Sequence, residues 1–199
     1  MTAKKGPPNE VRIIGGQWKR SKLPVADAPG LRPTPDRVRE TLFNWLPHDL
    51  SGWRCLDAFA GSGALGFEAA SRGASAVLLI ERDARLARSL RETQQRLNAT
   101  AIRVEAADAL AWMRRADAQS FELIFIDPPF DAGLFEPALT AAARLVVPGG
   151  FGYLEADRAF DDAAVAPLQL RLHRHGRAGN VHFHLLQRVS APASGESAD

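Results

Sequence analysis

The sequence is poor in cysteine and has no long apolar run. Its 199 residues include one cysteine, Cys55, which excludes a disulfide framework and leads us to expect a reducing, cytoplasmic environment. No apolar run reaches membrane-spanning length, and the N-terminus lacks the apolar stretch of a signal peptide. Hydrophobic residues make up 46% of the chain, enough for the core of one globular domain. We therefore expect a single domain outside the membrane, with Cys55 as a small core residue.

The chain has only a small net positive charge, but charged residues are unevenly distributed along it. The formal net charge is +2, yet residues 1–40 hold nine Lys or Arg against four acids, a balance of +5. The remaining residues hold 16 basic and 19 acidic side chains, a balance of −3. A basic front on a mildly acidic body predicts a polyanionic partner bound by the N-terminal segment. For Lys4 and Lys5 a solvated tail is the competing interpretation.

The chain is organised around a strand that ends in a carboxylate and two prolines. Residues 121–126 are β-prone and apolar, which predicts a buried parallel strand, and ligands bind beyond the carboxyl ends of such strands. Asp127 and Pro128 each precede a proline, so Asp127-Pro128-Pro129 forms a stiff extended elbow. The Asp127 carboxylate and the Pro128 carbonyl are two acceptors beside the Phe130 ring, which suits the NH2 group of a nucleobase. The alternative is an ordinary strand end with a proline-rich turn.

Strand and helix patterns alternate from Trp53 onward. Strands are predicted at 54–59, 76–81, 102–105, 123–127, 150–155, 168–175 and 181–188, and helices at 63–72, 83–98, 107–116 and 134–145. This alternation is typical of an α/β, doubly wound, mainly parallel sheet, here of seven strands with an antiparallel edge. We expect one domain at 11–189, with 11–50 as an N-terminal hairpin and helix, and disordered tails at 1–10 and 190–199.

The N-terminal extension combines glycine, basic and aromatic residues. Two short strands are expected around a Gly15-Gly16 turn, with Trp18 either stacking on a base or anchoring the hairpin to the sheet. In the following helix Thr34 is the expected N-cap, Pro35 the first helical residue and Pro47 the stop. Arginines gather at the start of this helix, where they either bind an anion or are simply solvated; they are Arg32, Arg37 and Arg39.

The first strand-to-helix turn is rich in glycine. Gly61, Gly63 and Gly66 match G-x-G-x-x-G, which taken alone would suggest a dinucleotide. Asp57, however, ends the strand before these glycines, where it would repel a pyrophosphate and suit an ammonium or sulfonium. Acids follow each of the first four strands of the sheet: Asp57, Glu81, Asp108 and Asp127. This row matches S-adenosylmethionine, which carries two cationic groups, a ribose diol and an adenine but no phosphate.

These motifs resemble those of a known family. The order of Asp57-x-Phe59-x-Gly61-Ser-Gly63, Glu81, Asp108 and Asp127-Pro-Pro-Phe130 is similar to that of class I amino-methyltransferases. The runs RIIGGQW (12–18), LRPTPDRVRETLFN (31–44) and DAFAGSGALG (57–66) resemble, more narrowly, bacterial 16S rRNA guanine-N2 methyltransferases. Asp and Phe stand where the wider motif often has Asn and Tyr, and both occur in this narrower family.

The resemblance implies roles for particular residues. Cofactor contacts would be Asp57, Phe59, Gly61, Gly63, Glu81, Asp108 and Ala109, with Thr34 and Arg37 near the methionine end. The target guanine would be held by Asp127, Pro128, Pro129 and Phe130. Expected RNA contacts are Arg12, Trp18, Lys19, Arg20, Lys22, Arg32 and Arg39. The implied partner is 16S rRNA, in an assembling 30S particle, and we expect a monomer.

Other interpretations remain open from the sequence. The Asp-Pro-Pro-aromatic turn recognises an amino group rather than one base, so an adenine-N6 DNA or glutamine amide methyltransferase is an alternative. A non-catalytic RNA-binding module is another, and an NAD oxidoreductase a third, which Asp57 disfavours. Four histidines lie on the last two predicted strands, at His173, His175, His182 and His184. Half-exposed strand histidines are commoner than metal ligands, so we expect no metal.

Overall fold

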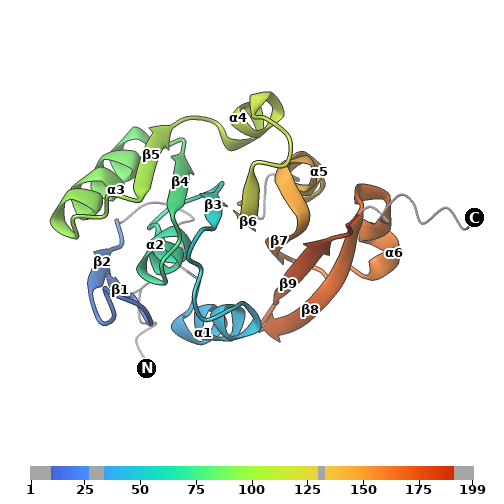
Figure 1. Cartoon of the computed structure of the whole chain (residues 1–199), viewed down its shortest axis with the longest axis horizontal. Coiled ribbons are helices and arrows are strands. Elements are labelled where there is room, and N and C mark those ends of the chain that lie inside the picture. Colours follow the sequence, from blue (N-terminus) through green and yellow to red (C-terminus); the bar gives the residue numbers. More distant parts are fainter. Residues whose placement is uncertain (1–9, 27–33, 130–132, 191–199) are drawn as a thin grey trace, which may run out of the picture.

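The computed structural model describes residues 10–26, 34–129 and 133–190. Within them one sheet has seven strands in the order β5-β4-β3-β6-β7-β9-β8 (Figure 1). Its strands are β3 (Arg54–Asp57), β4 (Ala76–Glu81), β5 (Ile102–Ala106), β6 (Phe121–Ile126), β7 (Val146–Ala156), β8 (Leu170–Ala178) and β9 (Val181–Arg188). Strands β3 to β7 pair in parallel, while β9 pairs antiparallel with both β7 and β8. The predicted fold class is confirmed.

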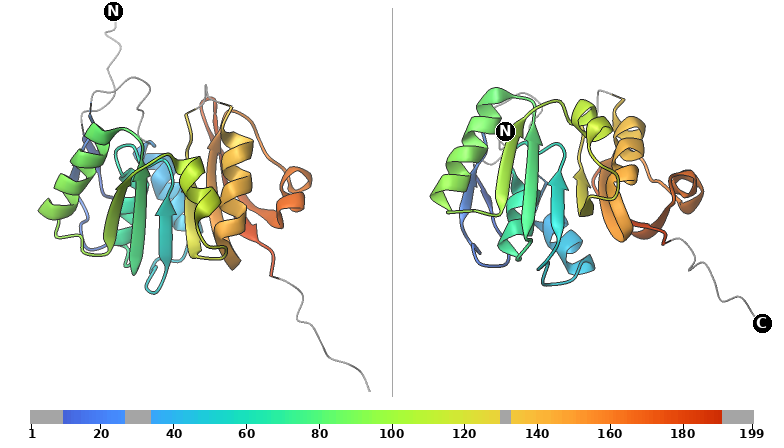
Figure 2. Two further views of the ribbon diagram at one scale, coloured as in Figure 1. Left: turned by 90° about the horizontal axis from the view of Figure 1, so that it is seen from above. Right: turned by 45° about the horizontal axis from the view of Figure 1, so that its top comes forward.

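Helices cover both faces of this sheet because the strands are apolar on both sides. The helices are α1 (Asp36–Trp45), α2 (Ala64–Ser71), α3 (Ala84–Arg96), α4 (Ala109–Arg115), α5 (Phe135–Leu145) and α6 (Asp162–Val165). On β6, Leu123 and Phe125 join the core under α1 and α2, whereas Ile124 and Ile126 join the core under α4 and α5. Figure 2 shows α1 and α5 on opposite sides of the sheet. Cys55 is buried in the first of these cores.

The N-terminal hairpin differs from the expected tight turn. Strands β1 (Glu10–Arg12) and β2 (Lys22–Pro24) pair antiparallel, but residues 13–21 connect them. The Gly15-Gly16 segment lies against α2, where the backbone N–H groups of Ile14 and Gly15 donate to Glu68 at 2.7 and 2.8 Å. Gly16 has a φ of +72°, and a Cβ there would lie 1.8 Å from the Ser71 carbonyl oxygen. The glycines therefore allow close docking on α2. Glu10, which the prediction assigned to the N-terminal tail, belongs to β1.

The start of α1 also differs from the prediction. Pro35 occupies the N-cap position without a side-chain cap, and the helix begins at Asp36. Thr34 does not cap the helix, because its hydroxyl donates to Glu155 at 2.8 Å instead. The end of the helix is as expected, since Leu46 before Pro47 is extended, with φ −94° and ψ 163°.

Three local features in the second half of the chain were not predicted. Strand β7 begins at Val146 and runs through the Pro148-Gly149-Gly150 segment, with an irregular register to β6. Helix α6, capped by Asp161, and the 3-10 turn Ala166–Leu168 lie between β7 and β8. Strand β8 has a register shift between Leu172 and Arg174. In the described parts of the chain, no helix is long and apolar enough to cross a membrane.

Candidate active site

The candidate site lies where the strand order reverses direction. From β3 the chain proceeds through β4 and β5 on one side, and then returns to β6 on the other side of β3. Asp57 is the last residue of β3 and pairs with Phe125, so Asp127 lies two residues beyond it on the neighbouring strand. Glu155 is on β7, one residue after the pair Ile126 and Leu154. Three carboxyl groups therefore lie at the ends of three adjacent strands, where ligands of doubly wound sheets bind.

Asp57 is buried and linked to the glycine turn. Its side chain is 2% exposed, and its Oδ2 accepts a hydrogen bond of 3.0 Å from the Gly66 backbone N–H in α2. Burial raises the pKa of the Asp57 carboxyl to about 7, and the negative charge of Glu81 adds to the effect. At position 66 a Cβ would meet Leu79 at 2.2 Å and Asp57 Oδ2 at 3.2 Å, so glycine is needed for this approach.

Asp127 and Glu155 are both held in surroundings that disfavour a negative charge. Burial raises the pKa of Asp127 well above its usual range, and the charges of Glu155 and Asp57 raise it further. Burial also raises the pKa of Glu155, although the hydrogen bonds from Thr34 and Tyr153 act in the opposite direction and lower it. Among the ion pairs of the described residues, none involves Asp57, Asp127 or Glu155. As far as the described residues show, the three carboxyl groups have no cation paired with them, so the site fits a positively charged ligand and opposes a pyrophosphate.

Glu155 is the residue that the sequence prediction missed. Its Oε1 accepts hydrogen bonds from the Thr34 hydroxyl at 2.8 Å and from the Tyr153 hydroxyl at 2.9 Å, and all three side chains are buried. Burial raises the pKa of the Tyr153 phenol well above its usual range, and the neighbouring Glu155 adds to this. The signal in the sequence was a glutamate within an apolar strand, since a buried carboxylate needs partners.

The acids after β4 and β5 bond to the loops that follow them. Glu81 accepts from the backbone N–H groups of Gly61 at 2.9 Å and Asp83 at 2.8 Å, which joins the glycine turn to the end of β4. Asp108 is exposed and caps α4 by accepting from Ala111 N–H at 2.8 Å. Both residues line the edge where the cofactor was predicted to bind, and their contacts with a cofactor remain a prediction.

The other predicted site residues have varied surroundings. Pro128 is buried and Pro129 exposed, and Phe130 lies outside the described residues. Gly63 has a left-handed backbone, with φ +77°, at the start of α2. Phe59 is half-buried, Ala109 is buried at the start of α4, and Arg37 is exposed on α1.

One predicted RNA contact is wrong, because Arg39 has no exposed surface. Its side chain is 0% exposed and donates to the carbonyl oxygens of Thr34 and Arg12, at 3.2 and 2.8 Å. It also pairs with Asp36 at 2.6 Å and approaches Glu68 at 3.7 Å. Arg39 therefore fixes the N-terminal extension to α1 and α2 and does not reach a partner.

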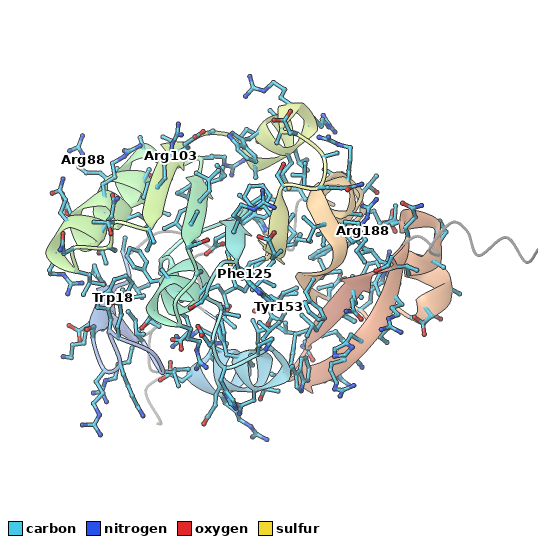
Figure 3. All side chains as sticks on the ribbon, in the orientation of Figure 1. Trp18, Arg88, Arg103, Phe125, Tyr153 and Arg188 are labelled. Atoms are coloured by element: carbon cyan, nitrogen blue, oxygen red, sulfur yellow. The ribbon has the colours of Figure 1, made fainter. Side chains whose placement is uncertain are left out.

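The remaining predicted RNA contacts stay predictions. Arg12, Lys19, Arg20 and Lys22 are exposed, and Lys22 pairs with Glu10 at 2.7 Å. Trp18 is half-buried against the core, and Figure 3 shows it on the side of the molecule formed by the hairpin. Arg32 lies outside the described residues.

The strand histidines form a ring stack. His175 Nε2 and His182 Nδ1 are 3.0 Å apart, and the rings of His175 and His184 stack at 4.7 Å. His184 is buried and accepts from Phe160 N–H at 3.0 Å, and burial lowers its pKa to about 4. Within the described ranges, no group of three or more His, Cys, Asp or Glu side chains is arranged to hold a metal ion.

The chain as a whole is similar to several known proteins. A family described as "Conserved hypothetical protein 95" matches residues 11–187. Ribosomal RNA small subunit methyltransferase D of Escherichia coli K12 is 42% identical over 94% of this chain and 93% of that protein. The protein of the same name from Haemophilus influenzae is 39% identical over 89% of this chain and 94% of its own. A solved structure of a putative methyltransferase from Escherichia coli covers 92% of this chain and 99% of its own, with 40% identity and a TM-score of 0.80. The chain therefore belongs to the family described as conserved hypothetical protein 95 and has the class I methyltransferase fold.

Proposed function

We propose that this protein transfers a methyl group from S-adenosylmethionine to the exocyclic N2 of a guanine in 16S rRNA. The observation that carries the proposal is the group of three carboxyls, Asp57, Asp127 and Glu155, at adjacent strand ends without a paired cation among the described residues. The names of the relatives support ribosomal RNA of the small subunit as the substrate class. The resemblance of the Asp127-Pro-Pro-Phe130 motif supports guanine N2 as the methylated atom.

The cofactor site would be built from the first three strand ends. Asp57 would attract the cationic methionine end, since a nearby positive charge would stabilise its buried carboxyl as an anion. Glu81 and Asp108 would accept hydrogen bonds from the ribose and the adenine, and the glycine turn would allow close approach of the ligand to the backbone. When bound, S-adenosylmethionine supplies an electrophilic methyl carbon on sulfur.

Asp127 would act on the target amino group. The guanine N2 lone pair is delocalised into the ring, so the free amine is a poor nucleophile. Asp127 and the Pro128 carbonyl would each accept one hydrogen of this NH2, which holds it in place and favours a pyramidal nitrogen. Asp127 would also stabilise the positive charge that develops on nitrogen, a preorganised electrostatic effect. The alkylated nitrogen is acidic and releases its proton afterwards, so no base is needed beforehand. Phe130 would stack on a base that is unstacked or single-stranded.

A methyl-transfer assay tests the proposal. The full chain is incubated with tritiated S-adenosylmethionine and either naked 16S rRNA or 30S particles that lack the modification, and the product base is identified by mass spectrometry. We expect N2-methylguanine at one position. Comparing the methylation rates of the two substrates shows whether the enzyme acts on free RNA or on the assembling particle. Ribosomal RNA as substrate would place the enzyme in the cytoplasm, and we expect it to act as a monomer. Transfer to adenine, DNA or a glutamine peptide, or none at all, would contradict the proposal.

A further inference from the structure

The β8–β9 hairpin carries charge of one sign only. Residues 163–190 contain no Asp or Glu, but they contain four arginines and four histidines. Three of the arginines, Arg171, Arg174 and Arg177, are on β8, the outermost strand of the sheet. All three are exposed. The rest of the body does not share this bias, because residues 41–199 as a whole carry 16 basic and 19 acidic side chains.

These three guanidinium groups bond only to neutral partners within the described part of the chain. Arg171 donates to Gln187 Oε1 at 2.6 Å, Arg174 to the His173 carbonyl at 3.0 Å and Arg177 to the Gly179 carbonyl at 2.8 Å. Some exposed arginines elsewhere pair with carboxylates, as in Arg54–Glu122, Arg85–Asp83 and Arg103–Glu105. Others, such as Arg91 and Arg96, donate to carbonyl oxygens, but no other strand of the described residues carries three such arginines. The three guanidinium groups are therefore in no ion pair of the described residues, although the Asp162 carboxylate lies against β8, where it accepts from the Leu172 backbone N–H at 2.7 Å.

The hairpin turn lies at the same edge of the sheet as the candidate active site. Ile126, Leu154, His184 and His175 align across β6, β7, β9 and β8, so Asp127 and Arg177 both lie just beyond this row. Neighbouring strands are about 4.8 Å apart, which puts the end of β8 roughly 15 Å from the end of β6 along the sheet. Figure 1 shows this hairpin beside α1, where Phe183 stacks on Trp45 at 5.3 Å. A nucleic acid with one base at Asp127 would bring its flanking nucleotides within reach of β8.

We propose that β8 is a second RNA-binding surface, separate from the N-terminal hairpin, which binds the phosphodiester backbone beside the target base through Arg171, Arg174 and Arg177. The proposal rests on the proposed function, because it takes the substrate to be RNA. Guanidinium groups bind phosphate oxygens through paired N–H donors. Arg171 and Arg174 pair with Gln187 and Leu185 and lie on one face of β8, whereas Arg177 pairs with His182 and lies on the other face beside the turn. From Arg171 to Arg177 an extended strand covers about 20 Å, the length of several nucleotides, so an RNA backbone that passes around this edge of the sheet could contact all three. Charges also protect edge strands from association, but alternating signs would serve that purpose equally well, whereas a single sign matches a polyanion.

The test is a pair of double charge reversals that change the net charge equally. Arg174→Glu with Arg177→Glu alters the surface, and Arg88→Glu with Arg91→Glu alters exposed arginines of α3 near the opposite edge of the sheet, where Figure 3 shows Arg88. Binding of the full chains to a 16S rRNA transcript is measured at several KCl concentrations between about 50 and 300 mM, which gives the slope of log K against log salt. This slope is negative, and its magnitude falls by about 0.7–0.9 for each phosphate that is no longer bound. We expect the β8 variant to reduce this slope by about 1.5 and the affinity roughly tenfold, and the α3 variant to match the wild type.

Folding and the proposed function are checked separately. Both variants should keep the wild-type circular dichroism spectrum and affinity for S-adenosylmethionine, and the milder pair Arg174→Gln with Arg177→Gln should lower the slope in the same direction. A wild-type slope in the β8 variants, or an equal reduction in the α3 variant, would overturn the proposal. If the wild type itself methylates no RNA, it is the proposed function that fails; if it does and the β8 variants bind like it, this inference alone fails.

Discussion

The Thr34 hydroxyl donates a 2.8 Å hydrogen bond to Glu155, 121 residues away in sequence, and this bond joins the N-terminal extension to the strand beside Asp127. Replacing Thr34 by valine keeps the shape but removes the donor from a buried carboxylate. We expect the free energy of unfolding to fall by about 1–3 kcal/mol, the usual cost of removing such a donor. Urea unfolding measures it. Thr34→Ser keeps the hydroxyl and should recover most of the stability; equal effects in both variants would contradict the role of the bond.

Glu155→Gln separates the charge of this residue from its hydrogen bonds. The amide oxygen can still accept from Thr34 and Tyr153, so we expect the fold to be retained and, because burial disfavours the Glu155 charge, no decrease in stability at neutral pH. Affinity for S-adenosylmethionine should fall on the order of tenfold, because one negative charge near the cation is removed. Isothermal titration calorimetry measures both binding constants. An unchanged affinity would show that Glu155 serves only the packing of Thr34.

Asp127→Ala should lower turnover by about 10²–10³, the usual cost of removing one preorganised electrostatic group. The fold should remain, because the side chain is at the end of β6 and lies outside the cores described above. The cofactor should still bind, with a decrease in affinity of the same order as for Glu155→Gln, because one carboxyl near the cation is removed. Single-turnover methyl transfer at saturating cofactor measures the chemical step. Asp127→Asn keeps one acceptor oxygen, so its turnover should lie between those of the wild type and the alanine variant. Turnover near the wild-type rate in the alanine variant would refute the role of Asp127.

The raised pKa of Asp57 predicts a pH dependence of both stability and binding. The unfolded carboxyl loses its proton near pH 4, whereas the folded one keeps it up to about pH 7. The contribution of Asp57 to stability therefore falls as the pH rises from about 4 to 7 and is constant above. Because a cationic ligand favours the ionised carboxyl, the contribution of Asp57 to the affinity for S-adenosylmethionine should rise with pH and become level above about 7.

Calorimetry at pH 6, 7 and 8 in buffers of different ionisation enthalpy measures the proton released on binding. Asp57→Asn should bind more weakly and lose part of this pH dependence, while Asp127, whose pKa is also raised, and Glu155 account for the remainder. The same pH profile in wild type and the Asn variant would assign the proton to the other two carboxyls.

The buried pair of Arg39 and Glu68 predicts a large decrease in stability when one partner is removed. Glu68 accepts from Arg72 and from the backbone of Ile14 and Gly15, and Arg39 adds its charge at 3.7 Å. Arg39→Met leaves this carboxylate less compensated and should cost about 3–5 kcal/mol in unfolding free energy. Arg37→Met, on the exposed side of the same helix, is the matched control and should change stability by about 0.5 kcal/mol or less. Equal losses of stability in the Arg39→Met and Arg37→Met variants would contradict the role of the buried pair.

Short-range patterns predicted the sheet well, whereas long-range contacts of the site could not be predicted. Strands β4 and β9 have the predicted bounds, because alternation and turn residues determine them locally. Thr34 is a good N-cap by type, but its hydroxyl bonds to Glu155, and no local pattern contains that partner. Arg39 is buried for a similar reason, since it bonds to Arg12 and lies near Glu68. Asp57 and Asp127 lie on neighbouring strands because the topology of doubly wound sheets places the first and fourth strands side by side, which the alternation of strands and helices already implied.

The N-terminal hairpin carries three basic side chains that we expect to bind RNA. Reversing the charge of Lys19, Arg20 and Lys22 together should weaken binding to 16S rRNA and lower the salt slope by about 0.7–0.9 for each phosphate that the hairpin no longer binds. The structure ranks these residues: Lys19 and Arg20 are exposed, and neither is in any ion pair of the described residues, whereas Lys22 already pairs with Glu10 at 2.7 Å. Lys19→Glu with Arg20→Glu should therefore account for most of the decrease in affinity, and Lys22→Glu alone for little. Filter binding across a salt series measures all three variants, and a wild-type slope in the triple variant would mean that this hairpin does not bind the RNA.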